Sequence, residues 1–214
     1  YTCLCLFTDN GYGGLEHADS TTLLATRTAL AGGKSYHEFL GLLAHELFHA
    51  WNVKRMRPAE LWDYDYEVEN LTPMLWLAEG WTAYYDDLIC RRAKLIGVDD
   101  YLAIVSKNLT ALWSGAGRFR QSLAEASFDA WIRYYRPDEN TRNSTQNYYG
   151  NGAIAATVLD LTIRRATKGA KCLDDAIRSL YRETFEKGRG YRLDDAAGLN
   201  LEPLLQDECI DTNV

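Results

Sequence analysis

Two histidines and a glutamate stand close together in the stretch LLAHELFHAWNVKRMRP, residues 42–58. On a helix, positions four apart share one face with Cβ atoms about 6 Å apart, so His45 and His49 can direct imidazole nitrogens at one ion. Glu46 follows the first histidine, where its carboxylate would lie beside the ion and could take a proton from water. The pattern predicts a zinc site with a general base; the alternative is that both histidines are ordinary helix residues.

A third ligand is predicted at Glu79, in the apolar stretch WLAEG. A lone carboxylate among such neighbours would be costly to bury, whereas a divalent ion shared with the two histidines would explain it. Catalytic zinc sites use three protein ligands and keep one position open, while structural sites usually have four ligands that commonly include cysteine. No cysteine is placed to help. If Glu79 instead faces water, the third ligand would have to be Asp86 or Asp87.

The elements that must position these groups follow from turn signals and apolar periodicity. Residues 1–34 are predicted to form a strand-rich edge, with strands at YTCLCLF and STTLLATRTAL. Ser35 and Glu38 read as a capping box before a helix from Phe39 to Val53, which carries both histidines. This helix would place the candidate ligands next to the sheet.

Helices dominate the remainder of the sequence. Acids alternate with aromatic or apolar residues in 61–70, which predicts an extended segment with one solvated face. Thr72 as N-cap and Pro73 at the first helical position predict a long helix that carries Glu79 and ends at Gly97. Further helices are expected at 99–113, 123–135, 149–167 and 174–187. The fold class is therefore α+β and mostly α, in one domain over 1–214 with a strand-rich edge at 1–34, a helical body at 35–190 and a poorly determined tail at 191–214.

Composition narrows the class of partner. The 214 residues are 47% hydrophobic, enough for a core, and carry a net charge of −7, which argues against nucleic acid and suits a cationic group such as a peptide ammonium. No apolar run reaches the roughly 18 residues of a membrane span, and no signal peptide is visible. The missing initiator Met suggests a fragment of a longer chain. Five scattered cysteines predict no disulfide framework and mildly favour a reducing, cytoplasmic compartment.

Several other side chains have simple explanations. Lys54 and the two arginines after it follow the helix that carries His45 and His49. Cations at this place complement the negative end of the helix dipole. Cys3 and Cys5 alternate on one face of a strand and are expected to pack there. The tryptophans nearest the motifs are expected in the core around the site: Trp51, Trp76 and Trp81.

Several motifs together resemble the glycyl aminopeptidase family of zinc metallopeptidases. They are HELFHAWNVKRMRP, LWLAEGWTAYYDD, GYGGLEHADST and SLAEASFDAWIRYYRP, and the resemblance runs from about residue 11 to 180. It implies a thermolysin-like (gluzincin) catalytic domain with one zinc ion held by His45, His49 and Glu79, and with Glu46 as the base. It also implies a catalytic core without the flanking N-terminal β domain and the PDZ domain that members typically carry.

Two further site residues are implied by the resemblance. GGLEH matches a glycine-containing edge strand whose glutamate receives the free α-amino group of the substrate, which would make Glu16 a substrate-binding residue. YYGNG matches a Tyr-x-Lys-Gly pattern at a helix start, which maps a catalytic transition-state tyrosine onto Tyr149, with Asn151 where lysine is usual. Without the resemblance, Glu16 would be a capping or solvated acid and Tyr149 a packed aromatic.

The sequence as a whole predicts a zinc-dependent aminopeptidase that acts on peptides or proteins with a free N-terminus. Glu46 would take a proton from the attacking water and give it to the leaving amine. One alternative is an endopeptidase of the same fold, and the second is a metal-binding scaffold without activity. The presence of Glu46 favours catalysis, because a structural ion needs only its ligands. Side-chain preference and oligomeric state are not predicted.

Overall fold

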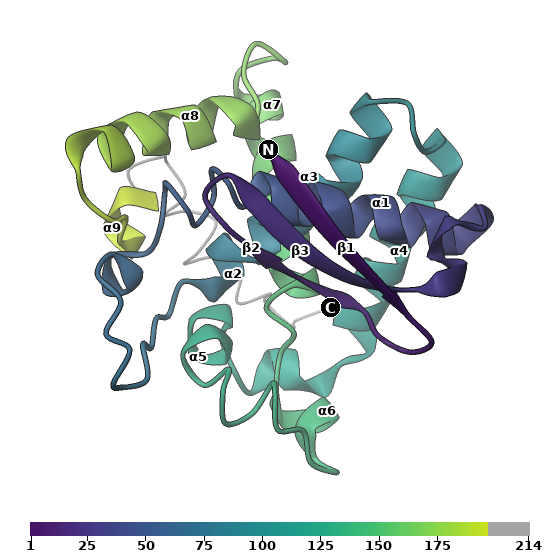
Figure 1. Ribbon diagram of the computed structural model, residues 1–214. Coiled ribbons are helices and arrows are strands. Elements are labelled where there is room, and N and C mark those ends of the chain that lie inside the picture. Colours follow the sequence, from purple (N-terminus) through teal and green to yellow (C-terminus); the bar gives the residue numbers. More distant parts are fainter. Residues whose placement is uncertain (197–214) are drawn as a thin grey trace.

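The computed structural model describes residues 1–196 and places a small sheet against a body of helices (Figure 1). The strands are β1 (Thr2–Thr8), β2 (Gly13–Glu16) and β3 (Ser20–Thr26). Strand β3 lies in the middle, where it pairs in parallel with β1 and antiparallel with β2. The predicted fold class, α+β and mostly α, is confirmed.

Helices make up most of the described chain after the sheet. They are α1 (Gly33–Phe48), α2 (Leu75–Ala78), α3 (Gly80–Arg92), α4 (Val98–Ser114), α5 (Leu123–Phe128), α6 (Thr141–Ser144), α7 (Gly150–Ala166), α8 (Leu173–Glu183) and α9 (Leu193–Ala196). Short 3-10 turns occur at η1 (Arg27–Leu30), η2 (Ala59–Leu61), η3 (Ala116–Phe119) and η4 (Phe185–Lys187). None of the helices in this part of the chain combines the length and hydrophobicity that crossing a bilayer requires.

One face of the sheet packs on α1. Successive residues of a strand point to opposite faces, and on β3 the alternate residues Thr21, Leu23 and Ala25 are buried. Leu23 and Ala25 form an apolar cluster with Phe39 and Leu42 of α1. This cluster fixes α1, the helix that carries His45, against strand β3.

Three side chains that were expected in the interior are exposed. Cys3 and Cys5 lie on β1, which forms an outer edge of the sheet, while α1 packs mainly on the other two strands. Trp51 is 48% exposed because it lies in the turn that follows α1. Trp76 and Trp81 are buried in the main core, as predicted.

Helix α1 starts and ends earlier than the sequence predicts. Gly32, with φ at +96°, precedes it, and Ser35 lies inside the first turn, so the expected capping box is wrong. The helix ends at Phe48, and the chain then turns back sharply through Val53, whose φ is +117°. His49 is therefore the C-cap of the helix and not an interior residue.

The long helix predicted over 72–97 is divided in two at Glu79. The backbone there has φ −96° and ψ −44°, and α2 ends just before it while α3 begins just after it. The side-chain amide of Asn52 donates to the carbonyl oxygens of Leu77 at 3.2 Å and Ala78 at 2.9 Å. These carbonyls belong to the helical turn before Glu79, so the turn after α1 is tied directly to the break.

Helices α3 and α7 touch through two glycines. A Cβ added to Gly80 would lie 2.5 Å from the Cα of Gly152, and one added to Gly152 would lie 2.5 Å from the carbonyl oxygen of Trp76. Backbones can approach this closely only where side chains are absent. The contact brings the start of α7, capped by Tyr149, beside Glu79.

The segment 61–70 is not extended as predicted. After η2 it forms turns and bends, closed by the side chain of Asn70, which accepts from the amide of Asp65 and donates to its carbonyl. The alternating acids of this segment are exposed, so its solvated character is correct while its conformation is not.

Later elements agree better with the sequence. Helices α4, α7 and α8 lie close to their predicted ranges, whereas α5 ends at Phe128 and the chain continues as turns toward Tyr135. In the predicted tail, Tyr191 is fully buried and pairs with Pro58. Residues 197–214, including Cys209, lie outside the described residues.

Candidate metal centre

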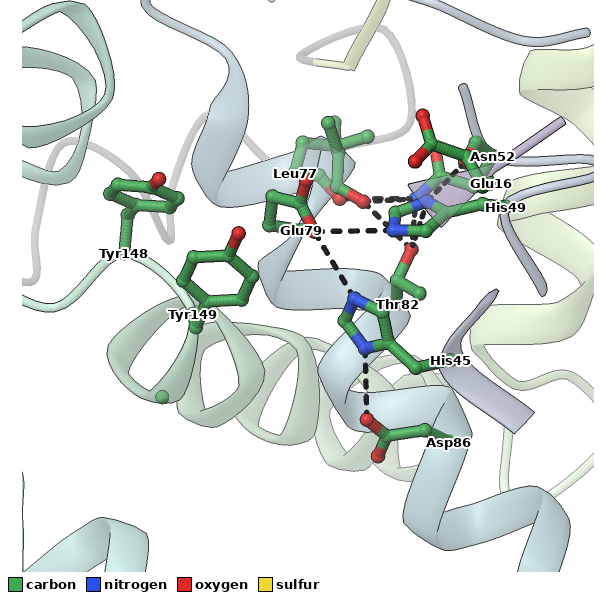
Figure 2. A network of polar contacts seen from close by, with 12 residues as sticks. Glu16, His45, His49, Asn52, Leu77, Glu79, Thr82, Asp86, Tyr148 and Tyr149 are labelled. Atoms are coloured by element: carbon green, nitrogen blue, oxygen red, sulfur yellow. Dashed lines mark hydrogen bonds and ion pairs between the residues drawn. The ribbon is translucent and has the colours of Figure 1, made fainter. Parts of the chain in front are cut away.

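Three side chains converge where the end of α1 meets the break between α2 and α3. His45 comes from the last turn of α1, His49 from its C-cap and Glu79 from the break (Figure 2). Oε2 of Glu79 lies 3.2 Å from Nε2 of each histidine, and the three candidate ligand atoms lie within 4.8 Å of one another. The structure therefore brings together the three residues that the sequence singled out as metal ligands.

The other ring nitrogen of each histidine has its own acceptor. Nδ1 of His45 donates to Oδ2 of Asp86 at 3.0 Å, and Nδ1 of His49 donates to the carbonyl oxygen of Asn52 at 2.8 Å. A proton on Nδ1 leaves Nε2 of a neutral imidazole as an electron-pair donor. Both Nε2 atoms face the Glu79 carboxylate, an arrangement of three Lewis bases that could hold a cation between them.

The dimensions of this group suit zinc. Bonds of about 2.0–2.1 Å in a tetrahedral site place ligand atoms about 3.3 Å apart, close to the 3.2 Å that separates Glu79 from each histidine. Two imidazoles and one carboxylate are a ligand set that zinc accepts in catalytic sites, where the fourth position is kept open. The residues present therefore fit a zinc ion.

The pKa values of His45 and Glu79 show that this site favours positive charge. Burial lowers the pKa of His45, but hydrogen bonds to Asp86 and Glu79 outweigh burial and raise it to about 10. Burial raises the pKa of Glu79, but His49 and His45 outweigh it and hold that pKa well below its usual value. Both pKa shifts show that positive charge on the histidines is favoured beside the Glu79 carboxylate.

Glu46 lies on α1 beside this group and is only 5% exposed. Its Oε2 has no hydrogen-bond partner among the described residues. Burial raises the pKa of its carboxyl above the usual value, against the opposing effect of the two histidines. A Cβ on Gly14 of β2 would lie 2.3 Å from the Glu46 carboxyl carbon, so the strand passes directly against the carboxylate.

Glu16 and Tyr149 flank the group from opposite sides. Figure 2 shows Glu16 next to His49 and Asn52, and Tyr149 beyond Glu79. Glu16 lies at the end of β2, and its Oε1 is 3.0 Å from Nζ of Lys54. The sequence predicted a helix-dipole interaction for Lys54; the structure gives it this carboxylate as its partner.

Tyr149 caps α7 with its ring centroid 6.2 Å from that of His45. Its hydroxyl lies 3.1 Å from that of Tyr135. Burial, and next the charge of Glu79, raise the pKa of Tyr149 well above its usual value, so the phenol keeps its proton. Asn151, where the resemblance expects lysine, donates its amide to Gln146 at 2.9 Å.

Comparison with known proteins agrees with this geometry. The family model of the M61 glycyl aminopeptidases matches residues 38–155, which include the whole His-His-Glu group. This chain belongs to that family. Its members are peptidases that typically depend on a metal. No curated protein matches the sequence.

A solved structure is also similar to this M61 chain. It is a crystal structure of an aminopeptidase N family protein from Idiomarina loihiensis, with a TM-score of 0.93 and 35% sequence identity. The match covers 97% of this chain but 38% of that one, so the chain spans less than half of that protein's length.

Sequence reasoning missed two residues of this M61 site. Asp86 was considered only as a substitute ligand, yet it orients His45. Asp86 lies seven residues after Glu79, on the same helical face. This spacing is a signal that could have indicated the role. Asn52 holds both His49 and the break before Glu79. No sequence pattern indicates this, because the contacts depend on the turn after α1.

Proposed function

We propose that this M61 chain is the catalytic core of a zinc-dependent aminopeptidase with a thermolysin-like (gluzincin) arrangement. The observation that carries the proposal is the His45–His49–Glu79 group with both Nδ1 atoms held by acceptors and with the buried Glu46 carboxylate beside it. His45, His49 and Glu79 would be the ligands of one zinc ion. The 214 residues would form one catalytic domain of a longer protein, given their share of the Idiomarina structure.

Glu46 is the proposed general base. When bound, zinc acts as a Lewis acid that acidifies water and polarises a peptide carbonyl. Glu46 takes the proton of the attacking water and delivers it to the leaving amine, a role that its raised pKa favours by making it a stronger base. Tyr149 keeps its phenolic proton and donates a hydrogen bond to the oxygen that gains negative charge.

Glu16 is the proposed anchor for the free α-amino group of the substrate. It lies on the side of the metal group opposite Tyr149, so a peptide held by its N-terminus at Glu16 would extend past Glu79 toward Tyr149. Pairing an ammonium group with a carboxylate would select substrates with a free N-terminus. Selection of a free N-terminus by Glu16 would make the protein an exopeptidase rather than an endopeptidase.

The ion pair between Lys54 and Glu16 favours one alternative function, an endopeptidase of the same fold. At 3.0 Å, Lys54 already neutralises the anchor carboxylate, and an endopeptidase would need no free anchor at this position. The two activities differ in how they treat a blocked N-terminus. An aminopeptidase cleaves alanyl and glycyl amides and spares their N-acetyl counterparts, whereas equal cleavage of internal bonds in blocked peptides would establish the endopeptidase.

The central test uses Glu46→Gln in the zinc-loaded protein. We expect kcat to fall about 10²–10⁴-fold on aminoacyl amides, the usual contribution of a general base, while elemental analysis still finds one zinc. Glu67→Gln, which changes an exposed acid, is the matched control and should keep parental kcat. Zinc loss in Glu46→Gln would make Glu46 a ligand, and hydrolysis insensitive to chelator in the parent would overturn the zinc mechanism.

A further inference from the structure

Three tyrosine hydroxyls form a chain that ends at Tyr149. Tyr148 is buried at 1% exposure and donates to the hydroxyl of Tyr135 at 3.3 Å. The Tyr135 hydroxyl in turn lies 3.1 Å from that of Tyr149. Tyr148 and Tyr149 precede α7, whereas Tyr135 belongs to the turns after α5, so the chain joins two separate segments.

The bond from Tyr148 limits where the other two protons can point, while either hydroxyl of the Tyr135–Tyr149 pair can be its donor. A phenol has one proton to donate and an oxygen that can accept. Because Tyr148 uses its proton on Tyr135, the proton of Tyr135 is available for the oxygen of Tyr149. The proton of Tyr149 is then available for another acceptor, and hydrogen bonds that run in one direction polarise one another. Tyr149 would thereby become a stronger donor at its free side.

We propose that Tyr135 is a positioning residue for the reaction: its hydroxyl donates to Tyr149 and so directs the Tyr149 proton toward the substrate oxygen. This inference rests on the proposed function, in which Tyr149 donates to that oxygen. Tyr148 holds the far end of the chain from inside the core, where it packs in the main apolar cluster. Tyr135 itself is 50% exposed, so removing its hydroxyl leaves the core intact.

The surroundings of Tyr135 allow its hydroxyl to be tested separately from its ring. The ring stacks on Trp131 with centroids 5.4 Å apart, and Trp131 is itself exposed. Tyr135→Phe keeps the stacked ring and removes only the hydroxyl. Trp131→Leu removes the stacking partner and keeps the hydroxyl. The two variants form a matched pair.

The first experiment is a double-mutant cycle on kcat in the zinc-loaded protein. Tyr149→Phe should lower kcat about 10²-fold, as loss of an oxyanion donor does. Tyr135→Phe should lower kcat about five- to tenfold with KM unchanged, the effect of one hydrogen bond. The double variant should match Tyr149→Phe alone, because Tyr135 acts only through Tyr149. Trp131→Leu should keep parental kcat.

Several outcomes would overturn the proposal. They are a double variant that loses a further five- to tenfold, a Tyr135→Phe protein with parental kcat, or a Trp131→Leu protein that loses as much as Tyr135→Phe. Parental kcat in Tyr149→Phe would show that Tyr149 donates to no reacting oxygen, which would overturn the proposal as well. That last result leaves the zinc peptidase itself standing, because Glu46→Gln and the metal content test it independently.

A second readout does not depend on turnover. A phosphinic dipeptide analogue has tetrahedral geometry at the reacting position and charged oxygen atoms that Tyr149 can reach only if its proton is directed there. Its dissociation constant, measured by titration calorimetry on the zinc-loaded protein, should rise five- to tenfold in Tyr135→Phe, in step with the fall in kcat/KM. Tyr148→Phe probes the same chain from its buried end and should weaken the analogue in the same direction. An unchanged dissociation constant of the analogue in both folded variants would contradict the proposal.

Discussion

Glycine at position 14 determines where the Glu46 carboxylate can lie. Its missing side chain gives room to a carboxyl group that any Cβ would overlap, since the distance would be 2.3 Å. Glu46 is buried and has one oxygen without a partner among the described residues, so few other contacts hold it in place. Strand β2 therefore leaves room for the carboxylate of Glu46, the proposed base, because position 14 carries no side chain.

Replacing Gly14 with alanine should displace Glu46 without touching the metal group. We expect Gly14→Ala to lower kcat at least tenfold while zinc content stays at one ion per chain, because His45, His49 and Glu79 are unchanged. Leu15→Ala is the control, since Leu15 is 59% exposed on the neighbouring position of the same strand. Steady-state kinetics with elemental analysis makes the measurement, and parental kcat in Gly14→Ala would show that Glu46 relaxes freely.

Asp86 should set zinc affinity through His45. Acceptors behind a metal-binding histidine commonly change affinity 10–100-fold when lost. We expect affinity to decrease in the order parent, Asp86→Asn, Asp86→Ala, because asparagine can still accept from Nδ1 but carries no charge. Titration against a competing chelator measures this order. Asp99→Asn, at the exposed start of α4, should match the parent, and parental affinity in Asp86→Ala would remove Asp86 from the site.

At the scale of elements, the site depends on how helix ends meet. The end of α1, the break at Glu79 and the start of α7 all converge on the metal group, and the contact between Gly80 and Gly152 sets the distance between two of them. Each candidate ligand therefore lies in the last turn, at the end or at an interruption of a helix rather than in its regular middle.

Gly152→Ala tests this contact between α3 and α7. The new methyl group would lie 2.9 Å from the Cα of Gly80 in α3 and 2.5 Å from the carbonyl oxygen of Trp76 in α2. Overpacking of this kind typically costs about 1–3 kcal/mol. For a chain of this size we expect Tm to fall by about 2–12 °C. Gly41→Ala is the control, because its nearest neighbour would be at an ordinary 3.7 Å and alanine favours a helix. Equal Tm values for the two variants would contradict the prediction.

The sequence predicts regular elements of this site better than their interruptions. The spacing of His45 and His49 on one helix, and the apolar surroundings of Glu79, are local properties, so they led to the three converging residues. The break at Glu79 could not be predicted, because it involves hydrogen bonds from Asn52, more than twenty residues away. The contact between Tyr135 and Tyr149 likewise depends on the path of the turns after α5.

Across the whole molecule, the metal group joins segments that are distant in sequence. His45 and Glu79 are 34 residues apart, and they belong to the helix under the sheet and to the helices of the main core. A bound ion would connect these two parts directly.

Removing zinc should therefore destabilise the fold as a whole. At a free zinc concentration about 1,000 times its Kd, binding contributes about 4 kcal/mol, equivalent to a Tm difference of about 8–16 °C for a chain of this size. Thermal unfolding with and without chelator measures the difference. Glu79→Ala should show almost no such shift, and a parent whose Tm ignores the chelator would contradict the prediction.

If Glu16 anchors the α-amino group as proposed, its ion pair with Lys54 affects the release of the product. An amino acid released by hydrolysis carries the same α-ammonium group as the substrate, so a bare carboxylate would hold both equally well. With Lys54 at 3.0 Å, each arrival or departure of an ammonium group at Glu16 would exchange one cationic partner of the carboxylate for another. The free energy gained when an ammonium group binds is only the difference between its interaction with Glu16 and that of Lys54. The lysine would then speed departure of the product, at the expense of weaker initial binding.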